Sequence, residues 1–120
     1  MSERIVFITH RGKEILLVDL SNCPAREAER VLRAIPDFVT AQPRASVLIL
    51  ADFTGASLDA EARRAMKESA VFNKPHVKKS AWVGGESLAE DFHAEIRAFS
   101  RREFTSFRTQ AEAMAWLVED

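Results

Sequence analysis

An uninterrupted apolar run covers residues 47–51 and ends abruptly in Asp52, Phe53, Thr54 and Gly55. A run of this length without polar alternation is typical of a strand that is covered on both faces, and its valine and isoleucine add the strand preference of β-branched residues. Residues 46–55 are therefore predicted to contain a central buried strand. Because open α/β sheets bind ligands and partners at the loops beyond the carboxyl ends of their strands, function is sought just after Asp52.

Four more strands are predicted around this one. Residues 4–9 and 14–19 are rich in strand-forming residues and are joined by a polar connection that contains a glycine, which indicates an antiparallel hairpin. Residues 77–83 lead into Gly84 and Gly85 and are predicted to form the next strand, and residues 104–107 a short final one.

Apolar residues at helical spacing predict four helices, which begin near Pro24, at residue 60, after Ser87 and after Thr109. Pro36 interrupts the first pattern, so the chain beyond it is predicted to be either a kinked continuation or a separate turn. The second helix, residues 60–73, is expected to be capped by Asp59. The expected buried residues of the second and third helices are Leu58, Ala62, Ala65, Met66, Ser69 and Phe72, and Leu88, Phe92, Ile96 and Phe99.

The order of elements predicts an α/β fold: a mixed, mostly parallel five-stranded sheet flanked by about four helices, with an N-terminal antiparallel hairpin. With 120 residues and no segment that resembles a linker, residues 1–120 are predicted to form a single domain. The last helix carries the strongest local signal, since Thr109 and Glu112 have the spacing of a capping box.

The chain resembles the STAS-like, or SpoIIAA-like, family of small bacterial α/β proteins over almost its whole length. The resemblance is carried by residues 52–55 at the end of the central strand, by the Asn73-Lys74-Pro75 turn followed by Val83-Gly84, and by residues 107–109 leading into residues 112–117. It implies a STAS-like fold and a non-enzymatic regulatory or protein-interaction role, because none of these motifs is catalytic.

In the antagonist branch of that family, a serine at the start of the helix after the central strand is phosphorylated by a partner kinase. Of residues 57–61, only Ser57 has a hydroxyl that could accept phosphate, so Ser57 is the candidate phosphorylation site. The chain lacks the paired serine and glycine of that branch, and Asp59 and Glu61 would oppose the added charge. The other interpretation of Ser57 is a loop or capping hydroxyl.

The composition of the chain disfavours several classes of binding partner and cellular location. The 17 basic and 18 acidic residues leave a net charge of −1, so the molecule has no field that would favour nucleic acid or an anionic membrane. No apolar stretch reaches membrane-spanning length, and no membrane span is expected. Cys23 is the only cysteine, which excludes an intramolecular disulfide and favours a reducing, cytoplasmic location.

The candidate ligand or partner edge lies where neighbouring parallel strands end, and is expected to form a shallow crevice. Its residues are Asp52, Thr54, Gly55, Ser57, Gly84, Gly85 and Ser87. Amides near the paired glycines could hold an anion, although such a pair also serves tight turns. An aspartate in the position of Asp52 is more often a strand-end residue bonded to local amides than an acid–base group. No catalytic residue and no cofactor is predicted.

The remaining reactive side chains have ordinary interpretations. His10, His76 and His93 lack metal-ligand spacing, so no metal site is expected. Cys23 is predicted to be a buried or semi-buried thiol. A cluster of arginines around the last strand is either a solvated face or a basic patch for an acidic or phosphate-bearing partner. It comprises Arg97, Arg101, Arg102 and Arg108.

The leading hypothesis is a regulatory module that binds a protein partner. A homodimer is also considered, because cyclic dimers are the commonest soluble oligomers. The alternative is a carrier or sensor of a small apolar or anionic molecule held between helices two and three. This alternative rests on the aromatic residues of several elements and on the similar architecture of lipid-binding CRAL-TRIO domains. A partner module should show an exposed apolar patch, and a carrier an enclosed cavity.

Overall fold

The computed structural model describes residues 4–85, 88 and 90–119. The chain begins with an antiparallel hairpin of strands β1, Ile5–His10, and β2, Lys13–Asp19. Arg11 and Gly12 form the turn and both have positive φ angles, 52° and 79°. Two such residues are what a type I′ hairpin turn requires, so the glycine in the connection fixes the pairing that the sequence predicted.

The other strands extend this hairpin into one sheet of order β1-β2-β3-β4-β5. Strands β3, Val47–Asp52, β4, Val77–Val83, and β5, Thr105–Phe107, run parallel to β2. All six residues of β3 are buried, and the strand pairs with β2 on one side and β4 on the other. The predicted mixed five-stranded α/β fold with a central buried strand is confirmed.

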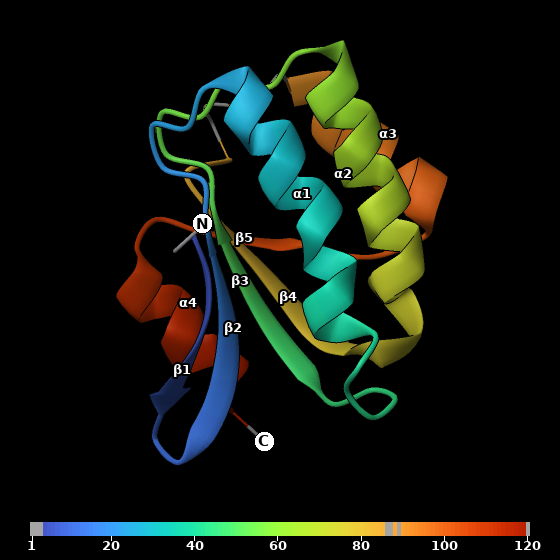
Figure 1. The fold of residues 1–120 in the computed structure, drawn as a ribbon. Coiled ribbons are helices and arrows are strands. Elements are labelled where there is room, and N and C mark those ends of the chain that lie inside the picture. Colours follow the sequence, from blue (N-terminus) through green and yellow to red (C-terminus); the bar gives the residue numbers. More distant parts are fainter. Residues whose placement is uncertain (1–3, 86–87, 89, 120) are drawn as a thin grey trace.

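Three helices cover one face of the sheet and a fourth covers the other (Figure 1). Helices α1, Ala25–Val39, α2, Ala60–Asn73, and α3, Glu90–Ser100, each connect one parallel strand to the next. Right-handed crossovers between strands that follow in order place all their helices on the same face. Helix α4, Gln110–Leu117, follows the last strand and packs on the opposite face against β3, β4 and β5.

The two faces have separate cores, and β3 contributes to both. Ile49 and Ala51 belong to the core beneath α1, α2 and α3, whereas Leu48 and Leu50 belong to the core beneath α4. Successive side chains of a strand point to opposite faces, so a strand buried on both sides needs apolar residues at every position. This is the physical basis of the apolar run at residues 47–51.

The prediction of burial is wrong for two residues. Phe72 of α2 is 61% exposed and Phe99 of α3 is 54% exposed. The buried residues of these helices form rows with steps of four residues. Phe72 and Phe99, each three residues after a buried position, lie on the next row around the helix and are exposed. The buried rows comprise Ala62, Met66 and Ala70, then Ala65, Ser69 and Asn73, and, on α3, Phe92, Ile96 and Ser100.

The helix ends follow the predictions in part. Pro36 lies inside α1, which continues to Val39, so the chain beyond the proline continues the helix and is not a separate turn. Asp59 caps α2, and its carboxylate accepts a hydrogen bond from the Ala62 amide at 2.9 Å. Thr109 caps α4 through the Glu112 amide at 3.1 Å, but the Glu112 carboxylate accepts from the Arg108 amide instead of that of Thr109. A short 3₁₀ turn, Lys74–His76, follows α2.

Over the described ranges, none of the helices is both long and apolar enough to span a membrane.

Candidate functional site

Asp52 is the centre of the polar contacts at the carboxyl end of β3. Its Oδ1 accepts hydrogen bonds from the Thr54 amide at 3.0 Å and from the Thr54 hydroxyl at 2.7 Å. Its Oδ2 accepts from Nε2 of Gln110, in the first turn of α4, at 2.8 Å. The side chain is 7% exposed, and its two oxygens are both occupied by neighbours. Of the two interpretations, a strand-end residue bonded to local donors is the one the geometry matches.

These hydrogen bonds and the burial of Asp52 shift the pKa of its carboxyl group in opposite directions. Burial raises the pKa, while the Thr54 hydroxyl, the Thr54 amide and the Gln110 amide group lower it, and the net shift is downward. The carboxylate is therefore ionised at neutral pH, because three donors compensate for the loss of water.

Gly84 brings the end of β4 against the same loop. Its φ is 71°, and a Cβ placed on it would lie 2.5 Å from the Thr54 nitrogen and 2.7 Å from the Thr54 Cα. The Phe53 amide also donates to the Val83 carbonyl at 2.8 Å. Only glycine allows both the left-handed conformation and so close a backbone approach. Asp52, Thr54 and Gly84 therefore converge, as the predicted meeting of strand ends requires.

The other described residues of the predicted edge contact different parts of the structure. Gly55, with a φ of 69°, packs against Asn22 in the loop after β2, and the Ser57 amide donates to the Cys23 carbonyl at 3.0 Å. Gly85 lies near Ser106 of β5 and Trp82. Ser87 falls outside the described residues. Thr54, Gly55 and Ser57 are exposed, so this loop presents its outer side to solvent while its backbone is bonded to the loop after β2.

A second aspartate repeats this arrangement on the neighbouring strand. Asp19 ends β2, directly opposite Asp52 in the sheet, and its Oδ1 accepts from the Ser21 amide at 3.0 Å and the Ser21 hydroxyl at 2.6 Å. Each aspartate is followed by one apolar residue, a hydroxyl residue and a residue with positive φ, which are Asn22 and Gly55. The parallel ladder thus continues into the loops, with the Leu20 amide bonded to the Asp52 carbonyl and the Asn22 amide to the Thr54 carbonyl.

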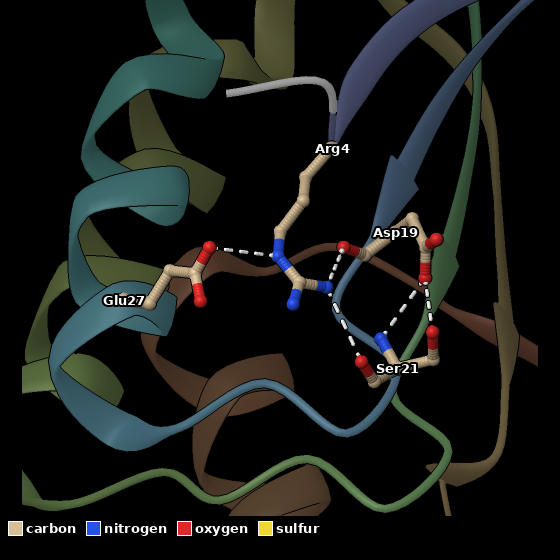
Figure 2. A network of polar contacts seen from close by, with 4 residues as sticks. All are labelled: Arg4, Asp19, Ser21 and Glu27. Atoms are coloured by element: carbon tan, nitrogen blue, oxygen red, sulfur yellow. Dashed lines mark hydrogen bonds and ion pairs between the residues drawn. The ribbon is translucent and has the colours of Figure 1, made fainter. Parts of the chain in front are cut away.

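Arg4 connects three segments next to Asp19 through hydrogen bonds (Figure 2). Its Nη1 donates to the carbonyls of Asp19 at 3.0 Å and Ser21 at 3.2 Å, and its Nε donates to the Glu27 carboxylate at 3.0 Å. The start of β1, the loop after β2 and the first turn of α1 are therefore joined by one side chain. Arg4, Asn22 and Gln110 were missed by sequence reasoning because they are distant in sequence from Asp52, and no spacing rule links them to it.

The remaining reactive groups are mostly internal. Cys23 is 1% exposed, and burial raises the pKa of its thiol, so the prediction of a buried thiol is confirmed. The His93 ring stacks on Trp82 with centroids 4.7 Å apart, and His76 Nδ1 lies 2.8 Å from the Gln42 carbonyl. Among the residues that the structure describes, no three histidine, cysteine or acidic side chains are grouped so that they could hold a metal ion.

One of the clustered arginines departs from the sequence interpretation. Arg97, Arg101 and Arg108 are exposed, but Arg102 is 9% exposed, so the prediction of a solvated face is wrong for it. Arg102 is one of the residues that line a cavity of about 50 Å³ between the sheet and the helices α1, α2 and α3. The chain turns inward at Arg102 because Arg101 has a positive φ, 57°, which ends α3 sharply. A single sequence carries no signal for such a turn.

No protein-family model matches the chain, and none of the curated proteins or solved structures matches it either. The resemblance to the STAS-like family therefore stays a prediction.

We expect Asp52→Asn to lower the free energy of unfolding by about 1 kcal/mol at neutral pH, because hydrogen bonds to a charged acceptor become bonds to a neutral one. The folded pKa of Asp52 lies below its unfolded value, so its contribution is present above about pH 4 and is lost as the pH falls through the folded pKa. Urea denaturation at pH 7, 5, 4 and 3 should show the difference from wild type shrinking at the two lowest values.

Asp37→Asn, at an exposed position of α1, is the control for loss of one negative charge. A difference between wild type and Asp52→Asn that stays constant down to pH 3 would contradict the role given to the carboxylate.

Proposed function

We propose that this chain is a non-enzymatic regulatory module of the STAS-like type, which binds a protein partner through the loops that follow β3 and β4. The observation that carries the proposal is the fixation of an exposed loop by buried contacts. The Asp52 carboxylate accepts two hydrogen bonds from Thr54, and Gly84 packs against Thr54. The loop backbone also forms hydrogen bonds with the backbone of Asn22 and Cys23.

A loop held in this way favours recognition. Binding costs less free energy when the contacting segment is already ordered, because little backbone freedom is lost. Thr54, Gly55 and Ser57 are exposed on the outer side of the loop, while the buried Phe53 and Ala56 anchor it to the core. The Asp52 carboxylate is fully engaged by Thr54 and Gln110, which supports a structural over a catalytic use of this acid.

Site-specific photocrosslinking tests this surface. A photoreactive phenylalanine analogue is placed at Ser57 on the proposed surface or at Arg44, which is exposed just before β3 and hence at the opposite end of that strand. Each variant is irradiated in cells of the native host. We expect one major crosslinked protein from the Ser57 position, which excess unlabelled protein displaces, and no such product from the Arg44 position.

A charge substitution on the same surface sharpens the test. Thr54→Arg places a long cation on the exposed loop and should reduce the Ser57 crosslink at least about tenfold, as disruption of a central interface residue does. Equal products from both positions, or a Ser57 product that Thr54→Arg leaves unchanged, would reject this surface as the binding edge.

Ser57 also remains the candidate for phosphorylation within this proposal. Its side chain is exposed two residues before the α2 cap, Asp59, whose carboxylate already accepts the Ala62 amide. Intact mass measurement of the protein from its own host, with Ser57→Ala as the control, shows whether a phosphate is attached there.

A further inference from the structure

Arg102 carries a buried positive charge, and none of the described carboxylates is paired with it. The residue follows α3 and is 9% exposed. Its Nη1 donates to the Ala70 carbonyl at 3.0 Å, its Nη2 donates to the Ser80 hydroxyl, and its guanidinium lies over the Phe104 ring, 4.8 Å from the centroid. Within the described ranges, no acidic side chain forms an ion pair with it.

Such a cation is unusual in a protein interior. Arginine is almost never fully buried unless it is paired, because removing its charge from water is costly. Burial lowers the pKa of Arg102 to about 10, and the group still carries its proton at neutral pH. A neutral hydroxyl, a carbonyl and an aromatic ring bind the guanidinium but leave its charge uncompensated.

A second polar group at the same cavity is unsatisfied. Asn73 is 3% exposed; its Nδ2 donates to the Ser69 hydroxyl at 3.0 Å, and its Oδ1 has no hydrogen-bond partner among the described residues. Asn73, Ser69, Ser80 and Arg102 all line the cavity. If the amide turns over, the Ser69 hydroxyl can donate to its oxygen, and its NH₂ group becomes a second donor for the cavity.

The rest of the lining is apolar and includes Met66, Phe53, Trp82 and Ile96. The cavity thus has a cationic, hydrogen-bonding part and a hydrophobic part. A volume of about 50 Å³ accommodates roughly three to five non-hydrogen atoms, if each takes the 10–15 Å³ that one water requires in this measure. Acetate has four such atoms and propionate five.

We propose that the cavity binds a short-chain monocarboxylate, with its carboxylate against the Arg102 guanidinium and Asn73 and its carbon chain among the apolar side chains. A carboxylate supplies the missing negative charge and matches the planar donors of a guanidinium. The proposal is independent of the partner surface at the ends of β3 and β4, because the exposed residues of that surface, Thr54, Gly55 and Ser57, do not line the cavity.

The surface outside the cavity favours entry of an anion. β5 pairs with Ala81–Val83, and none of the described strands pairs with the first half of β4 on that side. A groove of about 400 Å³ lies there, and Ser80 and Arg102 line both the groove and the cavity. Lys74, Lys78 and Arg101 also line this groove, while its one acid, Glu103, is paired with Arg97 at 3.2 Å. Clustered cations raise the local concentration of anions.

Fluorescence of Trp82 provides the test. Trp82 and Trp116 are the two tryptophans, so Trp116→Phe leaves only the one that lines the cavity. In this background, sodium acetate, propionate and butyrate are titrated against sodium chloride at constant ionic strength. We expect saturable changes with acetate or propionate, weaker ones with butyrate, and none with chloride.

Arg102→Met should weaken carboxylate binding by about ten- to a hundredfold, which corresponds to loss of a charged hydrogen-bond donor. Arg64→Met, on the exposed side of α2, should leave binding unchanged. Asn73→Asp places a carboxylate inside the cavity and should abolish the response to added acetate while the protein stays folded, as judged by circular dichroism. This variant keeps the test decisive if Arg102→Met does not fold.

Three results would overturn the proposal. An equal response to chloride would make the cavity a simple anion site, and a response retained in Asn73→Asp would place the ligand elsewhere. No saturable change in the wild-type cavity up to about 100 mM acetate, a limit that still detects binding of about −1.4 kcal/mol, would leave the cavity to water.

Discussion

Gly84→Ala is expected to lower the free energy of unfolding by about 2–5 kcal/mol. The left-handed conformation of this residue costs an L-residue about 1–2 kcal/mol. The added Cβ would also lie within 2.7 Å of three Thr54 atoms, two of them backbone, and such overpacking costs about 1–3 kcal/mol more. Denaturation in urea, followed by circular dichroism, measures the change.

Gly12→Ala is the matched control for this substitution. Gly12 has a similar φ of 79°, but a Cβ there would meet nothing within 4 Å. It should therefore show only the conformational cost of about 1–2 kcal/mol. If the two variants are destabilised equally, the contact between Gly84 and Thr54 does not hold the strand ends together.

Leu50→Ala should lower the free energy of unfolding by about 2–5 kcal/mol, the range found for buried leucines. Leu50 is fully buried in the middle of β3 and belongs to the core beneath α4, together with Ile15, Ala81 and Leu117. Its neighbours lie on the two paired strands, β2 and β4, and on the docked helix α4, so they cannot easily close the space that the side chain leaves. The same denaturation measurement applies.

Phe72→Ala provides the contrast. It removes a larger side chain from α2, but Phe72 is 61% exposed, so the expected change is within about 0.5 kcal/mol. A loss comparable to that of Leu50→Ala would show that Phe72 is covered in solution, as the sequence pattern predicted.

Most of the fold could be predicted because its signals are local. The glycine in the hairpin turn and the caps at Asp59 and Thr109 reflect contacts within a few residues, and the apolar run at residues 47–51 is a continuous pattern that can be recognised within one short segment. The buried side of a helix is less local, since it depends on how the helix lies on the sheet. For this reason Phe72 and Phe99, three residues beyond buried positions, were placed wrongly.

The candidate site was predictable only where strand ends meet. Parallel pairing brings Asp52, Thr54 and Gly84 together, and this follows from the order of elements. Gln110 forms a hydrogen bond with Asp52, which is 58 residues away in the sequence. Arg102 forms one with Ser80, which is 22 residues away. Neither contact has a spacing rule, and an arginine in a basic run is normally solvated, so the sequence pattern pointed away from the cavity.

The placement of α4 alone on its face has a consequence for synthesis on the ribosome. Residues 110–117 are made after all five strands, whereas each helix on the other face is made before the strand that follows it. Of the described helices, none therefore covers the side of β3 that bears Leu48 and Leu50 until residue 117 has left the exit tunnel. A nascent chain stalled before residue 110 would display this apolar side, and it would be a substrate for chaperones that bind exposed hydrophobic strands.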